Sequence, residues 1–380
     1  MRAVSTPGAR FALLDGLRFA AAAAVLLYHF TARRHSGWGV KPTEVFPDAS
    51  QVTQYGAFGV ELFFVISGFV ILMTAWGRTR DAYVASRVSR LFPAYWTSVL
   101  LTGGLLLLVW PEGKSIEWGD VLTNFTMVQS AYGVPHVDGV YWTLWAELRF
   151  YVLVLVLMTF GLTYRRLLAF TVIWPVAASL AANGDAPWLA TLLVVDQAPY
   201  FAAGIGIFLV FKFGHNVASW GAVAFNSLLA VHTADGALGS IANNTGHDPS
   251  QVVASIIVLA SIAAVALVTL TPLRTLRWPW LTTLGLLTYP LYLLHEYWGW
   301  WVISWARHLG DEYVALLLAI TITMVMAWLV VAVVERPLGP QVRRLVAHGL
   351  AAADTSLLDG KERRAGAVGL RVDQDGSGTP

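Results

Sequence analysis

Seven ionisable side chains stand inside stretches of sequence that are otherwise apolar, and these are the residues whose chemistry most needs an explanation. An ionisable group at the centre of a bilayer costs roughly 2.5–3.5 kcal/mol on insertion scales, so such groups are kept for binding, catalysis or pairing. Two of the seven are histidines, which exchange protons near neutral pH. The set is Asp15, Arg18, His29, Glu61, Glu147, Arg149 and His295.

Arg18 and His29 lie on one predicted helix, eleven residues apart. At about 1.5 Å per residue they are separated by roughly 16 Å, or about three turns, so both side chains can face one interior channel. The spacing puts a cationic anchor at one depth and a titratable base at another. It suits a long anionic molecule whose reactive end must reach the far side of a membrane. An acyl-CoA, with phosphates at one end and a thioester at the other, fits that description.

The composition indicates a membrane protein. The 380 residues are 57% hydrophobic and only 13% charged, whereas soluble domains are about 45–50% apolar and about 25% charged. A soluble globule, a nucleic-acid-binding protein and a disordered chain are excluded on this ground. The chain has no cysteine, which removes thiolate chemistry, and only 4 of its 25 basic residues are lysine. That bias is typical of GC-rich bacterial genomes, so the expected location is a bacterial plasma membrane.

An all-α fold of about ten transmembrane helices is predicted, because each span needs about 20 apolar residues. Residues 1–340 are expected to form the membrane domain. Residues 341–380, which are polar and glycine-rich, are expected to form a cytoplasmic tail that is ordered only in part. The predicted spans are 11–30, 56–76, 91–110, 141–161, 166–182, 196–213, 217–234, 251–271, 281–303 and 313–334.

The distribution of lysine and arginine predicts the orientation of these spans. With the N-terminus inside, 18 basic residues fall on the inner side and 5 on the outer side. Positive residues are retained on the cytoplasmic side, so both termini are expected to be cytoplasmic. Arg18 then lies in the inner half of the membrane. Four residues share one depth in the outer half: His29, Glu61, Glu147 and His295.

Six short segments, in order over some 320 residues, resemble the membrane-bound acyltransferase family 3. The first is LDGLRFAAAAAVLLYHF, with a basic residue and a histidine as Arg18 and His29. The others are VELFFVISGFVI (60–71), SRVSRLFPAYW (86–96), YWTLWAELRFY (141–151), LTYPLYLLHEYW (287–298) and VVERPL (333–338). Members of this family move acyl groups to carbohydrates, peptidoglycan or macrolides.

The resemblance implies an enzyme in which His29 is the catalytic base, helped by Arg18, and in which Arg87 and Arg90 hold the donor near the cytoplasmic face. The implied donor is cytoplasmic acyl-CoA, with acetyl-CoA expected, and the acceptor is a hydroxyl on the outer side. No metal is required. Direct transfer and an acyl-histidine intermediate are both compatible with the sequence.

Each further candidate has a structural alternative. Glu147 either orients His29, as an acid does in a catalytic triad, or forms an ion pair that only supports the fold. Arg149 is two residues further on and faces away from it. Arg87 and Arg90 are three residues apart and share a helical face, so they either clamp a phosphate or simply belong to the positive inner surface. The alternative for Arg18 is a pair with Asp15.

The remaining candidates concern the acceptor. Trp142 and Trp145 flank Glu147 and either line a sugar-sized pocket or anchor the helix at the interface. Glu61 and His295 are assigned to the substrate site, with a structural role equally compatible. Ser67 in the SGF segment has no base beside it in the sequence, so tight helix packing is favoured over a nucleophile.

The predicted function is therefore an integral membrane O-acyltransferase acting on a cell-surface or lipid-linked carbohydrate. A macrolide or other secondary metabolite is the alternative acceptor. A membrane transporter is the alternative from another class, and it would predict a matching pair of interrupted helices in the two halves of the chain. No such pair is visible.

Overall fold

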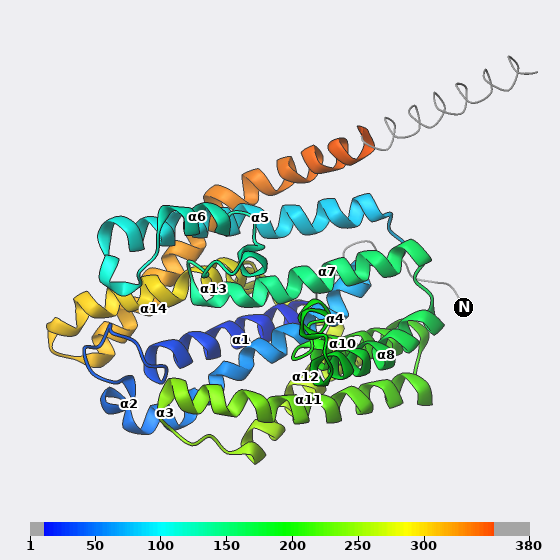
Figure 1. Cartoon of the computed structure of the whole chain (residues 1–380), viewed down its shortest axis with the longest axis horizontal. Helices are drawn as coiled ribbons and strands as arrows, with labels where there is room; N and C mark the ends of the chain where they lie inside the picture. Colours follow the sequence, from blue (N-terminus) through cyan, green and yellow to red (C-terminus); the bar gives the residue numbers. More distant parts are fainter. Residues whose placement is uncertain (1–10, 353–380) are drawn as a thin grey trace, which may run out of the picture.

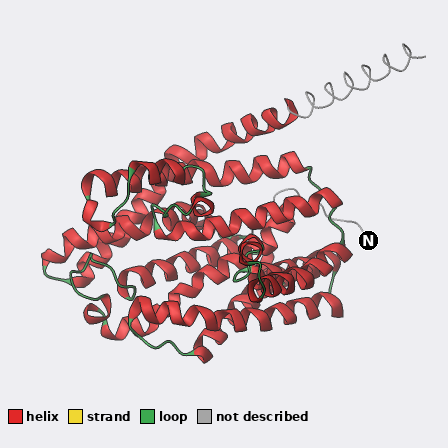
Figure 2. Cartoon of the chain, in the orientation of Figure 1, coloured by secondary structure: helices red, strands yellow, loops and turns green. Residues whose placement is uncertain are grey.

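The computed structural model describes residues 11–352, and every regular element in that range is helical, with no strand (Figure 2). This confirms the predicted all-α fold. The long apolar runs form helices because a helix satisfies all its backbone hydrogen bonds internally, which lipid requires.

The long helices correspond one to one with the predicted spans. Within residues 11–352 they are α1 (Ala12–Thr31), α4 (Gly59–Ala75), α5 (Arg80–Gly104), α7 (Trp142–Phe160), α8 (Tyr164–Asn183), α10 (Ala198–Phe213), α11 (Val217–Thr245), α12 (Gln251–Leu270), α13 (Pro279–Ala306) and α14 (Glu312–Val330). The shorter helices are α2 (Pro42–Val45), α3 (Pro47–Thr53), α6 (Trp118–Asn124) and α9 (Pro187–Leu192).

Eight of the helical segments in the described part of the chain are long and apolar enough to cross a membrane, so the protein is a multi-pass membrane protein. The two predicted spans outside this set are those of α10 and α13. α10 has only 16 residues. α13 has 28 residues, but its tyrosines and tryptophans, with His295 and Glu296, make it less apolar.

The end of the described chain differs from the prediction. Residues 341–352 were expected to begin a tail, but they continue the helix that starts at Glu312 and reaches Ala352. This helix leaves the bundle obliquely in Figure 1, where it is drawn in orange. Residues 1–10 and 353–380 lie outside the described residues, so most of the predicted tail is not described.

The first helix occupies the middle of the bundle, where it packs on α4 and α13 (Figure 1). A glycine makes the contact with α13 possible: a Cβ at Gly299 would stand 2.1 Å from the ring of Phe30. α10 packs on α4 in the same way, because a Cβ at Gly68 would stand 2.1 Å from the carbonyl oxygen of Phe201. The glycine of the SGF segment thus serves tight packing, as predicted.

Candidate active site

A cavity of about 120 Å³ brings together the three arginines that were predicted to bind the donor, and we call it the arginine cavity. Arg18 enters it from α1, whereas Arg87 and Arg90 enter from α5. Its remaining polar lining consists of Ser67, Thr143, Glu147, Tyr151, Thr288, Tyr289 and Tyr292. Three cationic side chains from two helices therefore share one cavity.

The two arginines of α5 are held differently. Arg87 donates to the hydroxyl of Thr74 (3.1 Å), and its guanidinium lies over the rings of Tyr83 and Tyr151. Its buried Nε has no hydrogen-bond partner among the described residues. Arg90 pairs with Glu335, with Nη1 3.8 Å from Oε1. Arg87 therefore keeps a buried N–H donor that is free to bind a ligand.

Glu147 lies in the arginine cavity, and this differs from the prediction that it orients His29. Its Oε1 accepts hydrogen bonds from the hydroxyls of Ser67 (3.1 Å) and Tyr151 (2.8 Å). Depth explains the difference. Glu61 stands in the first turn of α4, and Ser67 is six residues further on, or about 9 Å along the axis. Glu61 and Glu147 therefore do not share one depth.

A second and larger cavity, of about 570 Å³, contains His29, and we call it the histidine cavity. Of the residues predicted to bind the substrate, Glu61 and Trp142 line this cavity, whereas Trp145 is absent from its lining. Trp145 instead lies under the guanidinium of Arg149. The other polar or aromatic lining residues are Tyr28, Arg33, Phe58, Asp196, Gln197, Tyr200, Thr233, Ser240, Asn244 and Tyr292.

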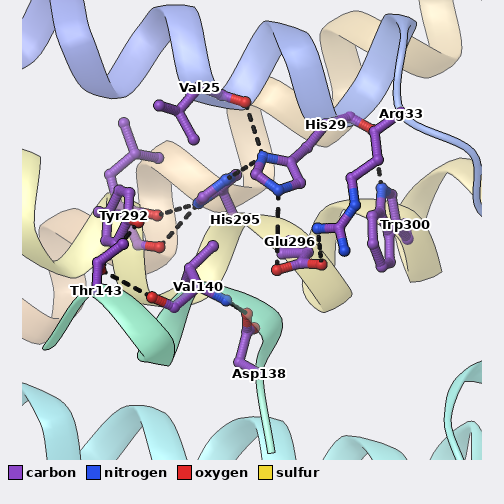
Figure 3. A network of polar contacts seen from close by, with 11 residues as sticks. Val25, His29, Arg33, Asp138, Val140, Thr143, Tyr292, His295, Glu296 and Trp300 are labelled. Atoms are coloured by element: carbon purple, nitrogen blue, oxygen red, sulfur yellow. Dashed lines mark hydrogen bonds and ion pairs between the residues drawn. The ribbon is translucent and has the colours of Figure 1, made fainter. Parts of the chain in front are cut away.

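The hydrogen bonds of the two histidines define which nitrogen of His29 is free (Figure 3). His295 Nδ1 lies 2.8 Å from the carbonyl oxygen of Tyr292, so Nδ1 carries the proton and Nε2 accepts. His29 Nδ1 lies 2.8 Å from the carbonyl oxygen of Val25 and 3.2 Å from His295 Nε2. Both neighbours are acceptors, so Nδ1 of His29 is also the protonated nitrogen. The lone pair of a neutral imidazole is then on Nε2.

The acid beside His29 is Glu296, which the sequence reasoning missed. Its Oε2 lies 3.9 Å from His29 Nε2, and its Oε1 accepts from Arg33 at 2.6 Å (Figure 3). The Glu296 residue is 0% exposed. The sequence contains a signal for this residue, because Glu296 is an ionisable side chain that directly follows His295 inside a predicted span. Arg33 was counted only as an outer-loop charge.

The ring of Tyr292 and the side chain of Val60 line both cavities. The hydroxyl of Thr143 donates to the hydroxyl of Tyr292 at 3.0 Å, which fixes the ring between α7 and α13. The arginine cavity and the histidine cavity are therefore neighbours with a thin common wall. Tyr292 and Val60 stand between the two cavities where these adjoin.

No group of three or more histidine, aspartate or glutamate side chains within residues 11–352 could hold a metal ion. The only concentration of cationic side chains in the two cavities is that of the arginine cavity, where an anionic cofactor or donor would fit by charge.

Comparison with known proteins identifies the family of the chain. A family model described as an acyltransferase domain, acyltransferase family 3, matches residues 11–335. The chain belongs to this family. The acyltransferase MdmB of Streptomyces mycarofaciens is 28% identical over 185 residues. The match covers 46% of this chain and 44% of that relative, so it spans less than half the length of either protein. No solved structure matches the chain. This acyltransferase family membership disfavours the transporter alternative.

Proposed function

We propose that this member of acyltransferase family 3 is an O-acyltransferase that moves an acyl group, with acetyl expected, from acyl-CoA to a carbohydrate hydroxyl. The observation that carries the proposal is the position of His29. Its unprotonated Nε2 stands beside the buried carboxylate of Glu296, in a cavity that adjoins the three arginines. A base and an anion-binding site are thus neighbours.

The arginine cavity is the proposed site for the donor's phosphates. Arginine binds phosphate through planar, charge-assisted pairs of hydrogen bonds, and Arg87 has an Nε without a partner. Arg18 and Arg90 supply further positive charge in the same cavity. The proposed orientation has ten spans in a bacterial plasma membrane, with both termini and the arginine cavity on the cytoplasmic side, where acyl-CoA is available.

The transfer step needs only the residues around His29. The donor's pantetheine arm passes Tyr292 and places the thioester in the histidine cavity. His29 Nε2 takes the proton of the acceptor hydroxyl, and the oxygen attacks the thioester carbonyl. The carbon–sulfur bond breaks, and the CoA thiolate takes the proton back from His29. Glu296, 3.9 Å away, stabilises the imidazolium that exists between these events. A base placed in this way contributes about 10²–10⁴-fold to the rate.

The lining of the histidine cavity supports a sugar as the acceptor. Sugars are recognised by hydrogen bonds to hydroxyls together with flat apolar surfaces for the ring faces. The cavity offers amides and hydroxyls at Gln197, Asn244 and Ser240, and aromatic rings at Tyr28 and Trp142. Its volume of about 570 Å³ lies within the range of about 300–1,000 Å³ that is usual for small-molecule sites.

The test uses membranes that contain wild type, His29→Ala or His232→Ala, supplied with radiolabelled acetyl-CoA and a panel of glycans, glycolipids and macrolides. His232 is the matched control because it is an exposed histidine on α11. We expect wild type and His232→Ala to label a carbohydrate, and His29→Ala to be inactive at equal abundance. Label on a macrolide alone would replace the carbohydrate as acceptor. Equal transfer by His29→Ala would refute the proposed role of His29.

A further inference from the structure

Asp138 is a buried acid next to Glu296 that neither the sequence analysis nor the proposed mechanism uses. It is 0% exposed, and it precedes the turn Gly139–Tyr141 that leads into α7. Its Oδ1 accepts the backbone N–H of Val140 at 3.2 Å (Figure 3). Its Oδ2 has no nitrogen or hydroxyl donor among the described residues, and the same is true of Glu296 Oε2.

The backbone brings the two carboxyl groups together at a glycine. A Cβ at Gly139 would stand 2.6 Å from Glu296 Oε2 and 2.7 Å from Oε1, so the carboxylate rests directly on the main chain beside Asp138. The Asp138 and Glu296 side chains are within hydrogen-bond reach of each other. Two buried carboxyl groups so close cannot both be ionised, and one of them retains a proton. Arg33 pairs with Glu296, which makes Glu296 the ionised member.

Of the two carboxyl groups, that of Asp138 keeps the proton. Burial and the neighbouring charge of Glu296 raise the pKa of Asp138 well above its usual value. The charge of Lys114 opposes this effect and is the smaller influence. The titratable or charged groups around Asp138 are Glu296, Tyr292 and Tyr297 of α13, Arg33 after α1, Lys114 before α6, and Tyr141 in its own turn.

We propose that Asp138 is a positioning residue that, as the neutral acid, donates a hydrogen bond from Oδ2 to Glu296 Oε2. Glu296 is then fixed at both oxygens, by Arg33 at Oε1 and by Asp138 at Oε2. The carboxylate is thereby held at the distance from His29 at which it stabilises the imidazolium without taking its proton. This inference rests on the proposed function, because it assigns Asp138 a role in the same reaction.

Two substitutions separate the proposed hydrogen bond from Asp138 to Glu296 from the structural role of Asp138 as acceptor for the Val140 N–H. Asp138→Asn keeps an acceptor for the Val140 N–H and keeps a neutral donor toward Glu296. Asp138→Ser also caps the turn, since serine is as good a cap as aspartate, but its hydroxyl is too short to reach Glu296. Both variants are compared with wild type for transfer of label from acetyl-CoA over a range of pH, at equal abundance in the membrane.

We expect Asp138→Asn to keep kcat within about threefold of wild type near pH 7, and Asp138→Ser to lose roughly tenfold or more, because a small displacement of a catalytic group is costly. Wild type should lose kcat as the pH rises through the raised pKa of Asp138 and the carboxyl group ionises. In Asp138→Asn this loss should be absent or shifted upward. Equal activity of all three proteins at every pH would overturn the proposal, and so would an Asn variant as inactive as the Ser variant. Absence of transfer in wild type would instead refute the proposed function.

Discussion

A methyl group added at Gly139 tests the placement of Glu296 without touching either histidine or the donor site. In Gly139→Ala the new Cβ would meet Glu296 Oε2 at 2.6 Å, whereas ordinary contacts begin at 3.4 Å, so the carboxylate must retreat by about 0.8 Å. The clash is with the end of a flexible side chain, and the protein is therefore expected to fold.

The expected loss of kcat follows from the displacement of the Glu296 carboxylate. A misplacement of about 1 Å in a catalytic arrangement costs about 10²-fold in rate, so about 0.8 Å should lower kcat by roughly 30- to 100-fold. A 100-fold loss corresponds to about 2.7 kcal/mol of transition-state stabilisation. The KM for acyl-CoA should stay unchanged, because Gly139 lines the histidine cavity and not the arginine cavity.

The assay measures initial rates of label transfer against the concentration of acetyl-CoA, normalised to the amount of folded protein in the membrane. Gly119→Ala is the matched control, since a Cβ at this position meets nothing within 4 Å. A Gly139→Ala variant that keeps kcat within about threefold of the control would show that the position of Glu296 is unimportant. The reasoning on His29 and Glu296 would then be wrong.

Two further predictions separate the functions of the two cavities. Arg87→Ala should raise the KM for acyl-CoA by about 10- to 150-fold, since a hydrogen bond to a charged group is worth about 1.5–3 kcal/mol. The control is Arg78→Ala, which removes an exposed arginine and should leave this KM unchanged. A similar rise in both variants would attribute the effect to general surface charge. Glu296→Gln should lower kcat at constant donor KM, whereas Glu147→Gln should change the donor KM at nearly constant kcat. The same kinetic change in both glutamine variants would contradict the assignment of the two acids to separate cavities.

The sequence predicted the depth of the two histidines better than it predicted which acid lies beside them. Charge distribution and span length placed His29 and His295 at one depth, and their rings are in contact in the structure. The same reasoning failed for Glu147, because its side chain lies level with Ser67, six residues along α4 from Glu61, and so not at the depth assigned to it. Glu147 faces α4 at Ser67, and the acid at His29 comes from α13.

Asp138 illustrates a second limit of sequence reasoning. It lies outside the predicted spans, where no helical or strand period assigns it to the interior, and an aspartate before a turn ordinarily faces water. Only the tertiary fold shows that the loop before α7 folds inward onto Glu296. The arginine cavity was easier to anticipate, since Arg87 and Arg90 share a helical face and their segment resembles that of the acyltransferase family.

The thin wall at Tyr292 has a consequence for the permeability of the membrane. In the proposed orientation the donor's nucleotide never leaves the cytoplasmic side, and only its narrow arm and the acyl group cross the plane of Tyr292. The cell then loses no coenzyme with each turnover and needs no separate carrier for it. In the proposed mechanism the ring of Tyr292, which accepts a hydrogen bond from Thr143, would close the passage when the arm is withdrawn. The proposed enzyme would thereby transfer acyl groups outward without opening a path for protons or small ions.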